Sequence, residues 1–170
     1  EEDDAFFVGL GLSQSEQLMF ITSGDHVTSE VRFVPRANLL AEQELIQGRR
    51  EGHEYDVEHQ GDSAETGRLI IRSNRNHPNF DLLETPMTST EEASWQMLLP
   101  GDANHYLMGH VAFADALVVC LRINGLDQIQ IVSGDDSHVI EFPEPAYSVD
   151  LGTNPNYRTS TLRLAYTSMV

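Results

Sequence analysis

The chain has 170 residues, of which 40% are hydrophobic and 22% are charged, so it has the composition of a folded domain or of a large part of one. Its net charge of −17, from 27 acidic and 10 basic residues, repels phosphate groups, and we therefore expect no nucleic-acid partner. No apolar run approaches the roughly 20 residues that a membrane-spanning helix needs, so we expect no membrane partner either.

Short alternating or apolar runs, separated by turn-forming residues, predict that the chain is almost entirely β-strand. In chain order these runs lie at 5–8, 18–21, 31–33, 44–47, 55–58, 69–71, 80–82, 95–99, from Tyr106 onward, and at 117–119, 129–131, 138–142, 147–151 and 162–164. The sharpest turn between them is Asn124-Gly125, a pair that accepts the positive φ angles of a two-residue hairpin. The only helix candidates are the short segments 38–43 and 90–94.

A longer period underlies the strands. Phe33, Leu82 and Ile131 hold equivalent places and follow one another at intervals of 49 residues. Four strands in each repeat of 40–50 residues are typical of β-propeller blades, which bury their two faces by stacking on neighbours. We therefore predict an all-β fold of about three and a half four-stranded antiparallel blades, at about 5–52, 53–104 and 105–146 with an incomplete blade at 147–170. A β-sandwich with accidental spacing is the alternative.

The densest polar cluster is the run from His53 to His59. On a strand, His53, Tyr55, Val57 and His59 share one face, and the acidic residues share the other face as a stripe at the edge of a blade. The stripe consists of Glu54, Asp56 and Glu58. The two histidines lie roughly 20 Å apart at about 3.3 Å per residue, too far to bind one metal ion. Whether the stripe binds anything stays open.

No Gly-x-Ser-x-Gly motif occurs, so the nucleophile elbow of an α/β-hydrolase is missing from this chain. Ser63 lies in a predicted loop, and Cys120 lies in an apolar run that favours a buried, inert thiol. A single cysteine cannot form an intramolecular disulfide, which favours a reducing compartment, and we expect a cytoplasmic protein. We assign no catalytic, cofactor-binding or metal-binding residue and expect no cofactor.

Several stretches resemble the N-terminal propeller of the oligopeptidase B (protease II) group in the prolyl oligopeptidase family of serine peptidases. They include residues 52–62 (GHEYDVEHQGD), 142–149 (FPEPAYSV) and 161–168 (TLRLAYTS), together with 26–32, 71–74, 79–82, 98–100, 151–155 and Trp95. The resemblance covers almost the whole chain in order. Residues 63–67 depart from it and look like a short insertion in a hairpin.

The resemblance implies a seven-bladed propeller followed by an α/β-hydrolase domain with a Ser-His-Asp triad. Such enzymes cleave short peptides after Arg or Lys, and the propeller covers the active site and excludes large substrates. No triad position falls within this chain, so we expect a segment of a longer protein that lacks the hydrolase domain and is inactive alone. Its expected partners are peptide substrates and the hydrolase domain, and the acidic field is expected to steer cationic peptides.

Two other functions stay open, a stand-alone propeller that acts as a binding scaffold and a glycan-active propeller. A partial propeller also exposes terminal blade faces, here the runs 5–8 and 162–166, and an open strand edge. We therefore expect the fragment to self-associate.

Overall fold

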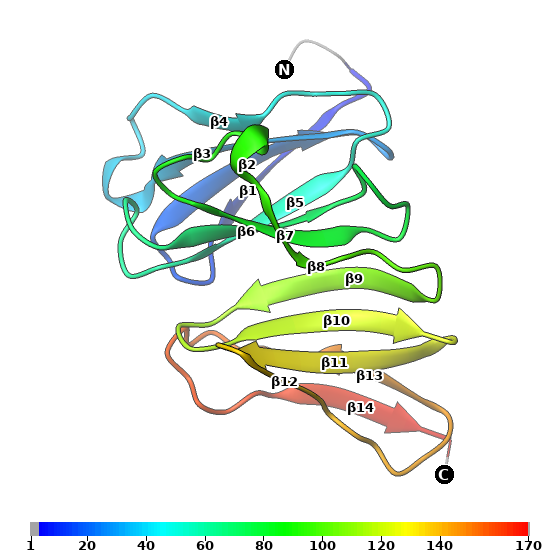
Figure 1. The fold of residues 1–170 in the computed structure, drawn as a ribbon. Coiled ribbons are helices and arrows are strands. Elements are labelled where there is room, and N and C mark those ends of the chain that lie inside the picture. Colours follow the sequence, from blue (N-terminus) through cyan, green and yellow to red (C-terminus); the bar gives the residue numbers. More distant parts are fainter. Residues whose placement is uncertain (1–3, 170) are drawn as a thin grey trace.

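The computed structural model describes residues 4–169, and within them fourteen strands form four antiparallel sheets (Figure 1). The first sheet contains β1 (Phe7–Leu12), β2 (Leu18–Gly24), β3 (Ser29–Pro35) and β4 (Glu44–Gln47). The second sheet contains β5 (Tyr55–Gln60), β6 (Arg68–Ser73), β7 (Asp81–Pro86) and β8 (Gln96–Leu99). The third sheet contains β9 (His105–Ala112), β10 (Leu117–Ile123), β11 (Leu126–Ser133) and β12 (Asp136–Val139). The fourth sheet contains β13 (Tyr147–Leu151) and β14 (Leu164–Ser168).

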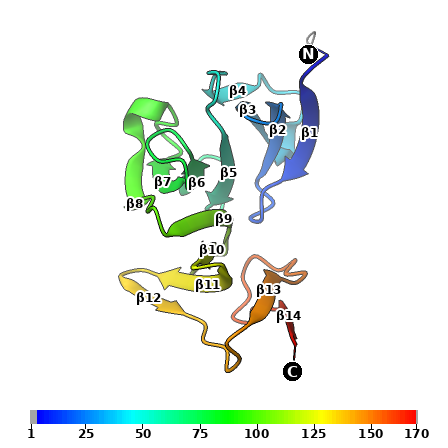
Figure 2. The same cartoon turned by 90° about the vertical axis from the view of Figure 1, so that its right-hand side faces the viewer.

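Each sheet is a meander in which consecutive strands pair, and the sheets form an arc. Figure 2 shows the first strands, β1, β5, β9 and β13, on the concave side of this arc, while β4, β8 and β12 lie at its outer side. This is the arrangement of propeller blades around an axis, so the predicted fold class is confirmed. Asn124 and Gly125 have φ angles of 51° and 83°, and they form the predicted tight turn between β10 and β11.

Several local predictions differ from the structure. Among the strands, β1 covers Phe7–Leu12 where 5–8 was predicted, and β14 covers Leu164–Ser168 where 162–164 was predicted. The two helix candidates are single 3₁₀ turns, η1 (Arg36–Asn38) and η2 (Glu92–Ser94), so the helical part of the first begins earlier and is shorter than predicted. Trp95 precedes β8, and its indole N–H donates to the Thr90 carbonyl within the turn. Strand β12 ends at Val139 because Phe142 packs on the rings of Tyr147 and Tyr166 instead of extending the third sheet.

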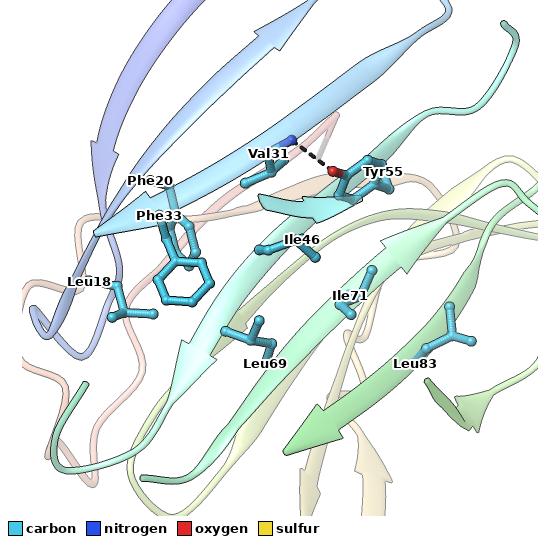
Figure 3. Close-up of a cluster of buried hydrophobic side chains, with 9 residues drawn as sticks. All are labelled: Leu18, Phe20, Val31, Phe33, Ile46, Tyr55, Leu69, Ile71 and Leu83. Carbon is cyan, nitrogen blue, oxygen red and sulfur yellow. Dashed lines mark hydrogen bonds between the residues drawn. The ribbon is translucent and has the colours of Figure 1, made fainter. Parts of the chain in front are cut away.

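Hydrophobic clusters fill the spaces between successive sheets. Between the first two sheets, Leu18 and Phe20 face Leu69 and Ile71 (Figure 3). Ile70, which lies between Leu69 and Ile71 in the sequence, points to the opposite face of the second sheet. It belongs to the hydrophobic cluster between the second and third sheets. Because both faces of the second sheet are covered, the run 69–71 is apolar at every position and fully buried, instead of alternating.

The Tyr55 side chain joins the first two sheets at a defect in the first one. The pairing of β3 with β4 shifts between Val31 and Arg32, which leaves Ile46 as an extra residue. The Tyr55 hydroxyl reaches this bulge from β5 and accepts the Val31 N–H at 2.7 Å (Figure 3). It also accepts the Gln47 N–H at 3.2 Å and donates to the Gln47 carbonyl at 2.5 Å. The hydroxyl therefore satisfies buried backbone groups that the interrupted ladder leaves unpaired.

We predict that Tyr55→Phe destabilises the chain by about 1–3 kcal/mol, because the bulge then keeps buried polar groups without a partner. The midpoint of urea unfolding measures the change. Tyr106→Phe is the matched control, since Tyr106 is 41% exposed at the equivalent strand of the third sheet. Equal midpoints for Tyr55→Phe and the unchanged chain would contradict the role assigned to this hydroxyl.

The first strand of the first sheet exposes apolar side chains that no other sheet within residues 4–169 covers. Val8, Leu10 and Leu12 are 55%, 73% and 46% exposed on β1, and the last two lie opposite Ile21 and Met19. At the other end of the chain the structure differs from the expectation, because Leu162 and Leu164 pack against the third sheet. The open apolar face is therefore concentrated on the first sheet.

We expect this 170-residue chain to self-associate through the first sheet, and more strongly at high salt, because salt screens the repulsion between copies that each carry a net charge of −17. Sedimentation velocity at about 0.05 M and about 0.5 M salt tests this, with Leu10→Asp as the variant that weakens association. A monomer at high micromolar concentration in both salts would disprove it.

Candidate functional site at the inner edge of the arc

Strand β5 carries the predicted polar cluster and occupies the concave edge of the second sheet. His53, Tyr55 and His59 are buried, as residues of one face, whereas Asp56 on the other face is exposed. The three acidic residues are not equivalent, since Glu54 is partly buried and Glu58 is largely enclosed. Within residues 4–169, no group of three or more His, Cys, Asp or Glu side chains is placed to hold a metal ion.

His59 links the second sheet to the loop between β1 and β2. Its Nε2 lies 3.0 Å from the Thr66 carbonyl oxygen, which can only accept, so Nε2 carries the proton. Nδ1 therefore accepts the hydrogen bond that Ser15 Oγ donates at 2.6 Å. Burial lowers the pKa of His59 and keeps the ring neutral. This serine–histidine pair has a carbonyl in place of the carboxylate of a catalytic triad, and it fixes a loop.

Glu58 lies beside this pair and is held by backbone donors. Its Oε1 accepts the N–H of Gln14 at 2.9 Å and the N–H of His59 at 2.7 Å. Burial raises the pKa of Glu58 to about 7, and the nearby Asp56 carboxylate adds to this effect, while the two N–H donors oppose it. The carboxyl group therefore titrates near neutral pH.

Asp56 ties the second sheet to the third. It accepts from Arg72 Nη1 at 2.7 Å, and its Oδ1 lies 3.4 Å from Nδ1 of the buried His110. Arg72 in turn donates from Nε to the Leu107 carbonyl at 2.8 Å and covers the ring of Phe80, 3.6 Å from its centroid. Burial lowers the pKa of His110, and the Asp56 carboxylate opposes this shift. Asp56 is thus engaged in holding two blades together.

The remaining candidate groups lie outside this cluster. Ser63 lies in the loop between β5 and β6, where its Oγ is 3.0 Å from Thr66 Oγ1. Cys120 is partly buried on β10, and burial, with the charges of Asp150 and Asp127, raises the pKa of its thiol to about 11. The thiol is therefore protonated at neutral pH and has little nucleophilic character.

The sequence placed the inner-strand cluster correctly on one strand but did not reveal its partners. Ser15 and Gln14 lie 44 residues before His59 and Glu58, in a loop that the sequence analysis did not single out. The pattern Ser-Gln-Ser in a polar turn between two strands was the only local signal. Its pairing with β5 depends on the stacking of two sheets.

These features define the chain as an arc of β-propeller blades with an ordered polar inner edge. The model of the prolyl oligopeptidase N-terminal β-propeller domain matches residues 1–170. The chain belongs to the prolyl oligopeptidase family and forms part of its N-terminal β-propeller domain. Within residues 4–169, no helix is long and apolar enough to cross a membrane.

Relatives and solved structures agree with this assignment. Protease 2 of Moraxella lacunata is 31% identical over 100% of this chain and 24% of its own length. Dipeptidyl aminopeptidase BI of Pseudoxanthomonas mexicana is 32% identical over 99% of this chain and 23% of its own length. Oligopeptidase B from Trypanosoma brucei superposes with a TM-score of 0.89 at 26% identity, over 99% of this chain and 25% of that one.

The resemblance to oligopeptidase B is therefore confirmed. Oligopeptidase B from Leishmania major has the same fold, with a TM-score of 0.89 at 22% identity. The chain spans about a quarter of the length of the relatives that it matches.

The titration of Glu58 yields a prediction about stability. Its folded pKa of about 7 lies above the ordinary value of 4.5, so the folded state favours the protonated form, and stability is lost as pH rises from about 4.5 through 7. Glu58→Gln mimics the protonated group. We expect it to match the unchanged chain at pH 4.5 or below and to be more stable at pH 8, by up to about 3 kcal/mol.

Urea unfolding at pH 4.5 and pH 8 measures this difference. Glu54→Gln, on the same face of the same strand region, removes the same charge and controls for the general effect of a net charge of −17. The interpretation fails if both variants change stability equally at pH 8.

Proposed function

We propose that this chain is the non-catalytic propeller segment of a serine oligopeptidase that cleaves short peptides after basic residues, and that the propeller gates access to the active site. The observation that carries the proposal is the match of the whole chain to the propeller domain of a peptidase family. The similarity to Protease 2 and to oligopeptidase B supports a peptidase, and the preference for basic residues is what the resemblance to the oligopeptidase B group implies.

The contacts between the blades supply a physical basis for a size filter. A filter must keep its width, and here the inner strand β5 of the second sheet is tied to both neighbouring blades. Tyr55 bonds the backbone of the first sheet, and the Asp56–Arg72 pair reaches the Leu107 carbonyl of the third. Such ties resist separation of the blades, so a short extended peptide enters a passage from which a folded protein is excluded.

The charge of the chain supports a preference for cationic peptides. A net charge of −17 raises the local concentration of positively charged ligands, and this effect falls with ionic strength. The proposed enzyme is cytoplasmic, since the single cysteine of this chain cannot form an intramolecular disulfide and suits a reducing compartment.

We expect the complete protein that carries this chain to cleave a short chromogenic peptide after Arg, in a reaction that a serine-directed inhibitor blocks. The 170-residue chain alone is expected to be inactive, because triad chemistry needs a nucleophile, a base and an oriented carboxylate together. A peptide with two additional lysines is expected to lose several-fold more kcat/KM than the singly charged peptide when salt rises from about 0.05 M to about 0.5 M.

The same arginine site placed in a folded protein of similar surface charge is the control for gating, and we expect it to resist cleavage. Equal kcat/KM values for the folded protein and the short peptide would refute gating. Cleavage that does not depend on a basic residue would refute the proposed substrate class.

A further inference from the structure

The loop between β13 and β14, residues 152–163, is long but ordered, and we call it the crossing loop. Asn154 clamps its base, because its Nδ2 donates to the Gly152 carbonyl at 2.7 Å and its Oδ1 accepts the Arg163 N–H at 2.7 Å. At the tip, Asn156 Oδ1 accepts the Arg158 N–H at 3.0 Å. The crossing loop therefore has a defined shape and position.

This loop reaches the other three sheets at one end of the arc. The first contact is made by Gln14, whose Nε2 donates to the Asn154 carbonyl at 2.6 Å. The second is an ion pair, with Arg158 Nη2 2.5 Å from Asp62 Oδ1. The third is the N–H of Ala114, which donates to the Tyr157 carbonyl at 3.0 Å.

The three partners share one structural position. Gln14, Asp62 and Ala114 all lie in the loops that join the first strand of a sheet to its second strand. These loops come together at the same end of the inner strands, and Figure 2 shows the crossing loop on the concave side of the arc, next to the tip of the β1–β2 hairpin. A loop that starts on the last sheet and contacts the first one must span the concave side between them.

The crossing loop borders a recess at this end of the arc. A cavity of about 310 Å³ separates it from the first sheet and is lined by residues of the β1–β2 loop, by Arg36, by Gly61 and Asp62, and by residues 155–158. Its charged groups are already paired with one another, Arg36 with Glu16 and Arg158 with Asp62. The cavity is therefore a polar recess between loops that is open to solvent and bordered by exposed ion pairs.

We propose that the crossing loop is a strap that closes the axial passage at this end of the propeller against peptides and opens when its contacts with the first two sheets break. This inference rests on the proposed function. It adds to the gating role by naming the element that closes one end of the axial passage. The contacts suit a reversible strap, because Asp62 and Arg158 are 70% and 65% exposed, and such ion pairs are weak and screened by salt.

The experiment uses the complete protein that carries this chain and the triple variant Gln14→Ala/Tyr157→Phe/Arg158→Ala, which we call the released variant. It lacks the side-chain contacts of Gln14 with the loop, of Arg158 with Asp62 and of the Tyr157 hydroxyl with the Gly61 backbone. Arg122→Ala is the matched control, because it breaks an ion pair with Asp127 at the opposite end of β10. Hydrogen exchange of the Ala114 amide, which bonds the Tyr157 carbonyl, reports release of the loop. We expect at least about tenfold faster exchange in the released variant only.

Closure is measured separately from catalysis. In a background in which Cys120 and every cysteine outside this chain are replaced by Ser, Gly109→Cys places a thiol on the inner strand β9, where an added Cβ meets no atom within 4 Å. A small thiol reagent is expected to react equally in all variants, and a polyethylene-glycol maleimide several-fold faster once the strap is released. Equal maleimide rates in released and unreleased proteins overturn the proposal.

The substrate readout then links the strap to gating. In the released variant, kcat/KM for a peptide of about 20 residues is expected to rise several-fold relative to a short chromogenic peptide. An unchanged ratio, with the loop shown to be released, overturns the strap as a gate. If the complete protein cleaves neither peptide, the proposed function fails, and the labelling rates still decide whether the loop closes the passage.

Discussion

The hydrogen bonds of the Tyr55 hydroxyl are the interaction on which the first half of the arc depends. A bulge in β4 leaves the N–H of Val31 and both backbone groups of Gln47 without ladder partners, and this single hydroxyl serves all three. Unpaired buried backbone groups cost more than an ordinary hydrogen bond contributes. The apolar cluster brings the two sheets together, but the hydroxyl sets where they meet. His53 stacks on the Tyr55 ring, and Trp95 packs against it at a tilt.

The seams between the sheets use different chemistry for the same purpose. The second seam relies on the Arg72 guanidinium, which pairs with Asp56, bonds the Leu107 carbonyl and covers Phe80. Phe80 has a φ angle of 68°, a conformation that costs free energy for a bulky residue, and its buried ring under Arg72 offsets that cost. The third seam is a largely aliphatic cluster around Val118, Ile129 and Val149, and Phe142 adds a ring stacked on Tyr166.

The polar residues on the inner strands are therefore engaged first in contacts that hold the protein's own structure, and only secondarily available to a ligand. Asp56 forms an ion pair with Arg72, Glu58 titrates near neutral pH, and His59 is neutral and enclosed. A cationic peptide near this edge meets the field of the whole acidic surface more than any one of these groups. These contacts are consistent with the proposed role of the propeller in steering and size selection, and they leave no inner-strand carboxylate of β5 dedicated to a basic side chain in that proposal.

The sequence by itself determined the all-β fold class, the repeat of about 49 residues and which residues of the run 53–59 share a face of their strand. Alternation and spacing are local properties of the chain, so they can be recognised without the structure. The sequence also placed Glu54, Asp56 and Glu58 on one face, where they looked alike. Only the tertiary structure made them different, since the Gln14 N–H and burial act on Glu58 while Arg72 pairs with Asp56. The contact of Arg158 with Asp62, 96 residues away, is likewise set by the stacking of sheets. Burial and pairing depend on segments that are remote in the chain, and no local pattern encodes which segments those are.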